Sequence, residues 1–351
     1  MTDSSTRTET QLGESFPAAP VSIFSLVSLL VAIALFGLGT PVLKWLVENG
    51  GHFGTVKKDA ISYCNVLFVG NLCSAAIVFL YFRPDRAAKQ FVEILRTRTF
   101  PLLANVLFAN VLAPTFVILA LEDTSAMTVI LLLQADATFH ALAGRFLLGE
   151  VISRRAALGF GLIACGIIVL GLVASHGELT TGYVYTLLAA LFRALGAITA
   201  RKTLADRRLL PAFLIARNLL GALVFYVLAM QMFGPGHFKD AFSVGLWELM
   251  VVYAALVIVV GQFSWYRALT DLPSRTVSAG WTLEPVFGLL FAYFLLGEAP
   301  ASLQWISVGL IFTGLAIANL GGKDRKQHSD RADGKKIYRP VISPDRPNSG
   351  V

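Results

Sequence analysis

Apolar residues in this chain form long runs that short polar stretches separate. A helix needs about 20 apolar residues to cross a hydrocarbon core of about 30 Å. Runs of that length predict ten membrane-spanning helices, at residues 22–47, 61–82, 100–121, 125–148, 156–175, 180–200, 210–231, 245–269, 274–297 and 303–321. The pattern therefore predicts an all-α polytopic membrane protein.

The polar segments outside these runs are expected to lie outside the membrane. Residues 1–21 are polar, and the apolar run that follows is too long for a signal peptide, so we expect a retained, disordered cytoplasmic N-terminus. Residues 322–351 are rich in Lys, Arg, Asp and Pro, which favours a disordered basic cytoplasmic tail. Residues 83–98 mix apolar and basic positions and predict an amphipathic segment on the inner leaflet.

Composition supports the membrane class and gives an orientation. Of 351 residues, 56% are hydrophobic and 15% charged, and the mean hydropathy is +0.68, which excludes an ordinary soluble enzyme. Outside the span interiors, 22 of the 25 Lys and Arg residues fall on the side that holds both termini. This asymmetry predicts an inner (plasma) membrane protein with both termini cytoplasmic, and it explains the net charge of +7 without a nucleic-acid partner.

The sequence also contains an internal repeat. The tetrapeptide LLGE occurs at 147–150 and again at 295–298, an offset of 148 residues that also aligns Asp123 with Asp271. The offset predicts two five-helix repeats, at 22–175 and 180–321. Because five is odd, the second repeat enters the membrane from the opposite side, and such inverted repeats are typical of secondary transporters.

Several motifs carry a resemblance to a known family. They are Tyr266-Arg267-Ala268-Leu269, the segment from Trp281 to Phe287, and the paired LLGE motifs with the glycines that follow them. Over residues 22–321 the chain resembles the EamA-type transporters of the drug/metabolite transporter superfamily. The resemblance implies ten helices in two EamA-like repeats and movement of small metabolites, commonly outward.

Charged residues inside the predicted spans are the main candidates for function. Asp136 and Glu284 lie near the middle of the fourth and ninth spans and are 148 residues apart. A charge at the centre of a membrane helix costs about 2.5–3.5 kcal/mol, so both carboxylates should face a cavity or a cation. Arg193 and Arg217 are the candidate partners, either as part of a site or as static pairs that fix helix packing.

Other polar residues extend the candidate site. His140 follows Asp136 by one helical turn and either relays protons or packs through a hydrogen bond. The predicted substrate or proton site comprises Asp136, Glu284, Arg193, Arg217, His140, Trp281, Asn71 and Asn218. Further amides and aromatic residues of the cavity lining are Asn105, Asn110, Gln134, Gln262, Trp265 and Tyr266. The predicted structural positions are Gly149, Glu150, Gly297, Glu298 and the helix-kinking Pro285.

The remaining residues of interest receive structural interpretations. Lys44 and Arg201 end spans and are interpreted as interface anchors. Cys64, Cys73 and Cys165 lie in apolar runs without a CxxC motif, so we interpret them as small packed core residues and expect no metal or other cofactor.

These features favour a secondary transporter, specifically an exporter of a small polar metabolite such as an amino acid or amine. It would work by alternating access around a midplane cavity in the lipid bilayer. Protons are a candidate coupling ion, and the sequence is compatible with a homodimer. The sequence has no Walker A motif for ATP. The alternatives are an intramembrane enzyme that uses Asp136 and His140, and a non-transporting membrane scaffold. Of these possibilities we favour the transporter, and we do not expect this protein to be an enzyme.

Overall fold

The computed structural model describes residues 22–50, 62–82, 84–149, 151–174, 180–204, 209–272, 274–302 and 304–320. The predicted tails at 1–21 and 322–351, and Glu150, lie outside the described residues. Within those ranges all regular secondary structure is helical.

Helices occupy every predicted span. The first half holds α1 (Ile23–Asn49), α2 (Tyr63–Tyr81), α3 (Pro84–Thr97), α4 (Thr99–Asn105), η2 (Val106–Leu112), α5 (Ala113–Asp123), α6 (Ala126–Leu132), α7 (Ala135–Leu148) and α8 (Arg154–Ala174). The second half holds α9 (Thr181–Thr203), α10 (Leu210–Met232), α11 (Gly234–Phe238), η4 (Lys239–Phe242), α12 (Val244–Tyr253), η5 (Ala254–Val260), α13 (Gly261–Asp271), α14 (Ser274–Trp281), α15 (Glu284–Leu296) and α16 (Gln304–Leu320).

Eight helical stretches in the described part of the chain are long and apolar enough to cross a membrane. The ninth and tenth predicted spans contain the shorter apolar helices Glu284–Leu296 and Gln304–Ala318. The segment predicted to be amphipathic forms α3, in which Ile94 is buried while Val92 and Leu95 are exposed.

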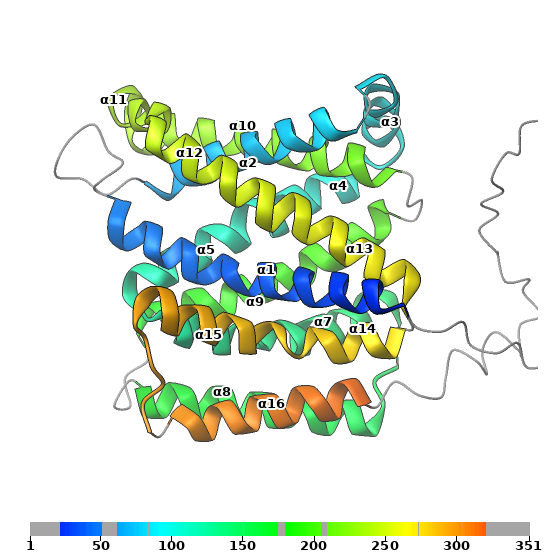
Figure 1. The fold of residues 1–351 in the computed structure, drawn as a ribbon, viewed down its shortest axis with the longest axis vertical. Helices are drawn as coiled ribbons and strands as arrows, with labels where there is room; N and C mark the ends of the chain where they lie inside the picture. Colours follow the sequence, from blue (N-terminus) through cyan, green and yellow to red (C-terminus); the bar gives the residue numbers. More distant parts are fainter. Residues whose placement is uncertain are drawn as a thin grey trace, which may run out of the picture.

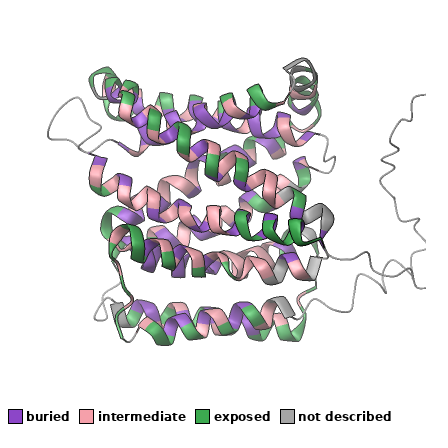
Figure 2. Ribbon diagram, in the orientation of Figure 1, coloured by how far each residue is buried: buried purple, intermediate pink, exposed green. Residues whose placement is uncertain are grey.

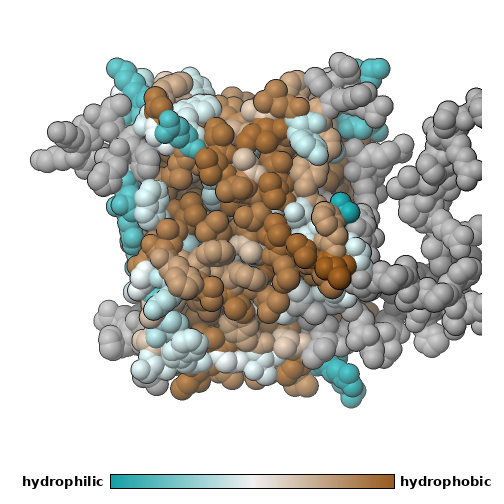
Figure 3. All heavy atoms as spheres, in the orientation of Figure 1, coloured by the Kyte–Doolittle hydropathy of each residue, from teal (hydrophilic) through white to brown (hydrophobic). Residues whose placement is uncertain are grey.

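The helices lie roughly side by side, with α8 and α16 as an outer layer and α2, α10 and α12 at the other end of the bundle (Figure 1). The start of α1 and the end of α16 lie at the same edge. Figure 3 shows a broad apolar surface across the helices, with hydrophilic residues gathered toward their ends. This distribution is the one that a hydrocarbon layer perpendicular to the helices requires.

Glycines bring α8 and α16 into close contact. A Cβ atom at Gly159 would lie 2.6 Å from the Ala318 nitrogen and 2.6 Å from the Gly314 oxygen, so no other residue fits without movement. This pair therefore packs backbone to backbone on one side, while its other side carries exposed positions (Figure 2).

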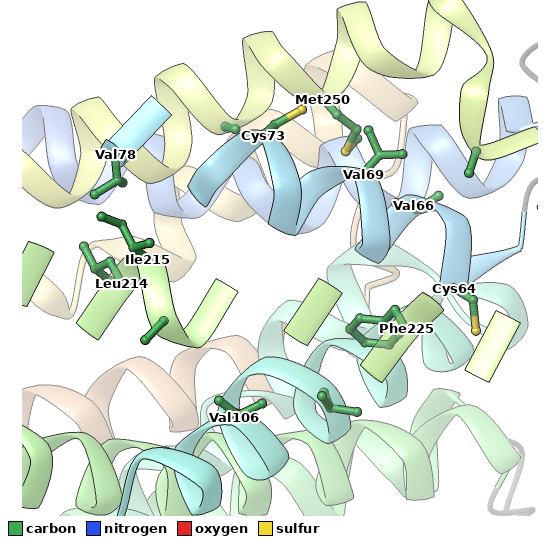
Figure 4. Packing of buried hydrophobic residues seen from close by; sticks show 14 of the residues in the cluster. Cys64, Val66, Val69, Cys73, Val78, Val106, Leu214, Ile215, Phe225 and Met250 are labelled. Atoms are coloured by element: carbon green, nitrogen blue, oxygen red, sulfur yellow. The ribbon is translucent and has the colours of Figure 1, made fainter. Parts of the chain in front are cut away.

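The largest hydrophobic cluster joins α2, α10 and α12, with residues such as Val69, Phe225 and Met250 at its centre (Figure 4). Cys64 and Cys73 belong to this cluster and are buried, as predicted. Cys165 is exposed on α8, so its interpretation as a core residue was wrong. An apolar run cannot distinguish a lipid-facing position from a core position, because both exclude water.

Two predicted spans are interrupted near their middle. Both spans, 125–148 and 274–297, were predicted as single helices, the second with a kink at Pro285. Instead α6 ends before Leu133 and α7 begins at Ala135, and α14 and α15 are separated by Thr282 and Leu283. Tight backbone bonds mark both breaks, from Asp136 N to Leu133 O (3.0 Å) and from Leu283 N to Gly280 O (2.9 Å). Each of these spans is therefore a pair of half-helices.

The second break has a simple chemical cause. Pro285 lies in the first turn of α15, where its missing N–H is tolerated, but it could not have continued the hydrogen bonding of α14. The first break has Ala137 at the equivalent position and forms without proline.

Candidate functional site

Three charged side chains converge from α7, α9 and α15. Arg193 Nε lies 3.2 Å from Asp136 Oδ2, and the two side chains form an ion pair. Glu284 is close enough to interact electrostatically with both Arg193 and Asp136. The two predicted acidic residues and one of the two predicted partners thus form a single cluster of two carboxylates and one guanidinium.

Gln134 completes this cluster at the break between α6 and α7. Its side chain lies beside Glu284, and its Nε2 atom donates to the Ile130 carbonyl at 3.0 Å. Gln134 is 8% exposed, so its amide is fixed by these contacts. The amide connects the half-helix from the first half of the chain to the carboxylate from the second.

The helix breaks place both carboxylates at helix N-termini. Asp136 lies in the first turn of α7, and Glu284 is the first residue of α15. The first backbone N–H groups of a helix have no partner within the helix and carry a partial positive charge, which favours an anion there. Each half-helix therefore helps to hold a negative charge that a continuous membrane helix would disfavour at this depth.

The charged side chains are not sealed from their surroundings. The side chain of Arg193 is 35% exposed and that of Asp136 is 26% exposed. Hydrocarbon does not solvate charges, so water or a polar ligand must occupy the space beside these groups. The arrangement can bind a small molecule that carries charge.

Three aromatic rings form a separate cluster beside α15. Trp281, at the end of α14, lies 4.7 Å from Trp265 and 5.8 Å from Phe36 between ring centroids, and Phe36 lies 6.4 Å from Trp265. Phe36 was not among the predicted site residues, because an aromatic residue in an apolar run carries no distinguishing signal. Trp281 therefore joins α1, α13 and α14 through its ring.

Two of the predicted amides contact each other across helices, and a role for Asn71 and Asn218 in binding stays a prediction. Asn110 Nδ2 donates to Asn71 Oδ1 and to the Arg217 carbonyl, both at 2.9 Å, and so connects η2 to α2 and α10. Gly221 makes room for this contact, since a Cβ atom there would lie 2.1 Å from Asn110 Nδ2. Asn218 is buried in α10 at 3% exposure.

The remaining predicted positions are placed as follows. Arg217 and His140 are half-buried, the latter on α7 one turn beyond Asp136. A role for either in binding substrate or protons stays a prediction.

The paired LLGE motifs end the two half-helices that follow the breaks. Gly149 ends α7 with a φ of +69°, and Gly297 ends α15 with a φ of +68°, the left-handed conformation that glycine adopts without strain. The carboxylate of Glu298 then accepts hydrogen bonds from Ala126 N (3.0 Å) and Met127 N (2.9 Å), at the start of α6. Glu150, its repeat counterpart, lies outside the described residues.

Comparisons with known proteins agree with the resemblance identified in the sequence. Residues 180–320 match the EamA-like transporter family. An "Uncharacterized transporter" of Synechocystis sp. is 27% identical over 303 residues, covering 84% of this chain and 87% of that protein. A "Probable amino-acid metabolite efflux pump" of Salmonella typhimurium is 28% identical over 203 residues, covering 56% of this chain and 68% of that protein.

A solved crystal structure supports the fold. It aligns with a TM-score of 0.55 at 18% identity and covers 86% of this chain and 97% of its own chain. The family match and the names of the relatives point to a transporter and not to an enzyme.

Proposed function

We propose that this EamA-type transporter exports a small polar metabolite, such as an amino acid or an amine, through the cluster of Asp136, Arg193 and Glu284. The observation that carries the proposal is the convergence of these charges at two helix breaks, with Asp136 from the first predicted repeat and Arg193 and Glu284 from the second. A site built by both halves of the chain changes its access when the halves move against each other.

Matched features of the two halves support inverted five-helix repeats and alternating access. The breaks, the left-handed glycines Gly149 and Gly297, and the π-helical turns η2 and η5 recur at an offset of 148 residues. The packing is matched as well, since α1 packs on α13 and α15 while α9 packs on α5 and α7. Two such halves around a midplane site are the architecture that alternates access by rocking.

The charges of the cluster favour certain substrates. Its carboxylates suit an ammonium group, and its guanidinium suits a carboxylate. Two carboxylates and one guanidinium leave one negative charge in excess, which either a cationic group of the substrate or a bound proton would neutralise. A zwitterion or an amine fits this balance, and the two relatives named as amino-acid metabolite efflux pumps are consistent with it.

Reconstitution into proteoliposomes tests the proposal. We expect Glu284→Gln to abolish uptake or release of labelled amino acids and amines, because it removes the charge that accepts the cationic group. Glu248→Gln is the matched control, since Glu248 is exposed on α12 outside the cluster. Equal flux for Glu284→Gln and the control, with and without a pH gradient, would refute a central role for this carboxylate.

Orientation belongs to the same proposal. The distribution of Lys and Arg favours an inner membrane location with both termini cytoplasmic, which impermeant labelling of each terminus in intact cells would test.

A further inference from the structure

The turn between α5 and α6 is held from two sides by residues far away in the sequence. Lys44 on α1 donates from Nζ to the Leu121 carbonyl (2.6 Å) and to the Thr124 carbonyl (3.2 Å). Glu298, in the loop after α15, accepts from the two backbone N–H groups at the start of α6. Lys44 is only 11% exposed, which makes its interpretation as an interface anchor wrong.

Both contacts match the charge of the helix end that they meet. The cation of Lys44 lies at the carbonyl end of α5, and the anion of Glu298 lies at the N–H end of α6. Such charge-assisted hydrogen bonds are stronger than neutral ones. Three segments that are separate in the sequence are therefore joined at the end of the bundle opposite the start of α1.

The turn is connected directly to the charged cluster. Helix α6 has seven residues, all of them buried, and at 1.5 Å per residue it is about 10 Å long. Glu298 binds the first turn of α6. Gln134, whose side chain lies beside Glu284, follows the last residue of α6 by two positions. A short, buried helix thus connects the surroundings of Glu284 and Gln134 to the contacts of Glu298.

The contacts of Glu298 are not needed to form α6. The hydroxyl of Ser125 already caps this helix by accepting from Thr128 N at 3.2 Å. The Glu298 contacts are additional and join the second half of the chain to the first. If the halves separate at this end, water can replace the carboxylate on these N–H groups.

We propose that Glu298 forms a latch between the two halves that holds this end of the transporter closed, that Lys44 fixes the turn to which Glu298 binds, and that release of the latch is coupled through α6 to the charged cluster. The inference rests on the proposed function, because a latch has a purpose only if the halves alternate. It goes beyond that function by naming the groups that control one of the two openings.

Thiol labelling of purified protein in nanodiscs tests the latch without any substrate. The reporter is Val129→Cys, introduced after the three native cysteines are replaced, because Val129 is fully buried in α6. We expect a charged, impermeant thiol reagent to label this reporter about tenfold faster when Glu298→Gln or Lys44→Met is added. A tenfold change corresponds to about 1.4 kcal/mol in the opening equilibrium.

Two controls separate opening of this end from general loosening. Glu248→Gln changes an exposed glutamate outside the latch and should leave labelling of the reporter unchanged. A protein that keeps only Cys73, which is buried among α2, α10 and α12, should stay unlabelled when Glu298→Gln is added.

Three results would overturn the latch. They are an unchanged labelling rate in both latch variants, an equal rise in the Glu248→Gln control, and a parallel rise at Cys73. None of these readings uses flux, so failure of the latch and failure of the transport proposal are distinguishable.

Discussion

The ion pair between Arg193 and Asp136 predicts an asymmetric response to removing each partner. Arg193→Gln leaves Asp136 and Glu284 as neighbouring carboxylates without the guanidinium that faces both. Asp136→Asn leaves Arg193 with Glu284 as a remaining partner. We therefore expect the arginine variant to be the less stable of the two.

The magnitude follows from the exposure of the pair. Breaking a buried ion pair costs about 3–5 kcal/mol, and exposed pairs contribute about 0.2–1 kcal/mol. The side chains here are 35% and 26% exposed, which places the pair between these limits. We expect Arg193→Gln to lower the free energy of unfolding by about 2–3 kcal/mol and Asp136→Asn by about 1 kcal/mol, on the basis of those ranges.

A double-mutant cycle measured by denaturant unfolding in mixed micelles gives the interaction itself. The double variant Asp136→Asn with Arg193→Gln should be more stable than the sum of the single effects predicts, by about 1 kcal/mol or more, because its remaining groups carry fewer unpaired charges. Effects that add within about 0.5 kcal/mol would show that the pair contributes no coupling. A larger loss for Asp136→Asn than for Arg193→Gln would refute the role of Arg193 as the shared partner.

Two further predictions concern close packing. Gly159→Ala should lower the free energy of unfolding by about 1–3 kcal/mol, because its Cβ atom would overlap the backbone of α16 at Ala318. Gly161→Ala is the control and should be neutral, because no atom lies within 4 Å of the added Cβ atom. Equal effects of the two variants in the same unfolding assay would contradict this packing. Gly221→Ala should displace the amide of Asn110 and lower the melting temperature of the protein. A melting temperature equal to that of the wild type would show that this amide contact is dispensable.

The fold was predictable because the hydrocarbon core imposes a length on each apolar run. The helices occupy the predicted spans, and the repeat offset relates Gly149 and Gly297, the left-handed glycines that end α7 and α15. The pairing of a carboxylate with an arginine was also predictable, since charges at this depth require partners. What the sequence left open was which arginine, because that depends on how α9 and α10 are rotated around their axes.

Other features depend on contacts between distant segments. No proline lies next to the break at Gln134, so the apolar run around this residue predicts a continuous helix. The roles of Lys44 and Glu298 arise because the fold brings a span end and a loop to one turn. A residue at the end of a span has the same local sequence whether it meets lipid headgroups or a helix terminus.

The π-helical turns η2 and η5 begin at Val106 and Ala254, 148 residues apart, and each has seven residues. A π-helical turn holds one residue more per hydrogen-bonded ring than an α-helical turn, and such turns are rare. Two independent acquisitions at matched positions would be a coincidence. If both halves descend from one ancestral gene, that gene already encoded the wide turn before it was copied, and the turn is older than the two-half protein that now carries it.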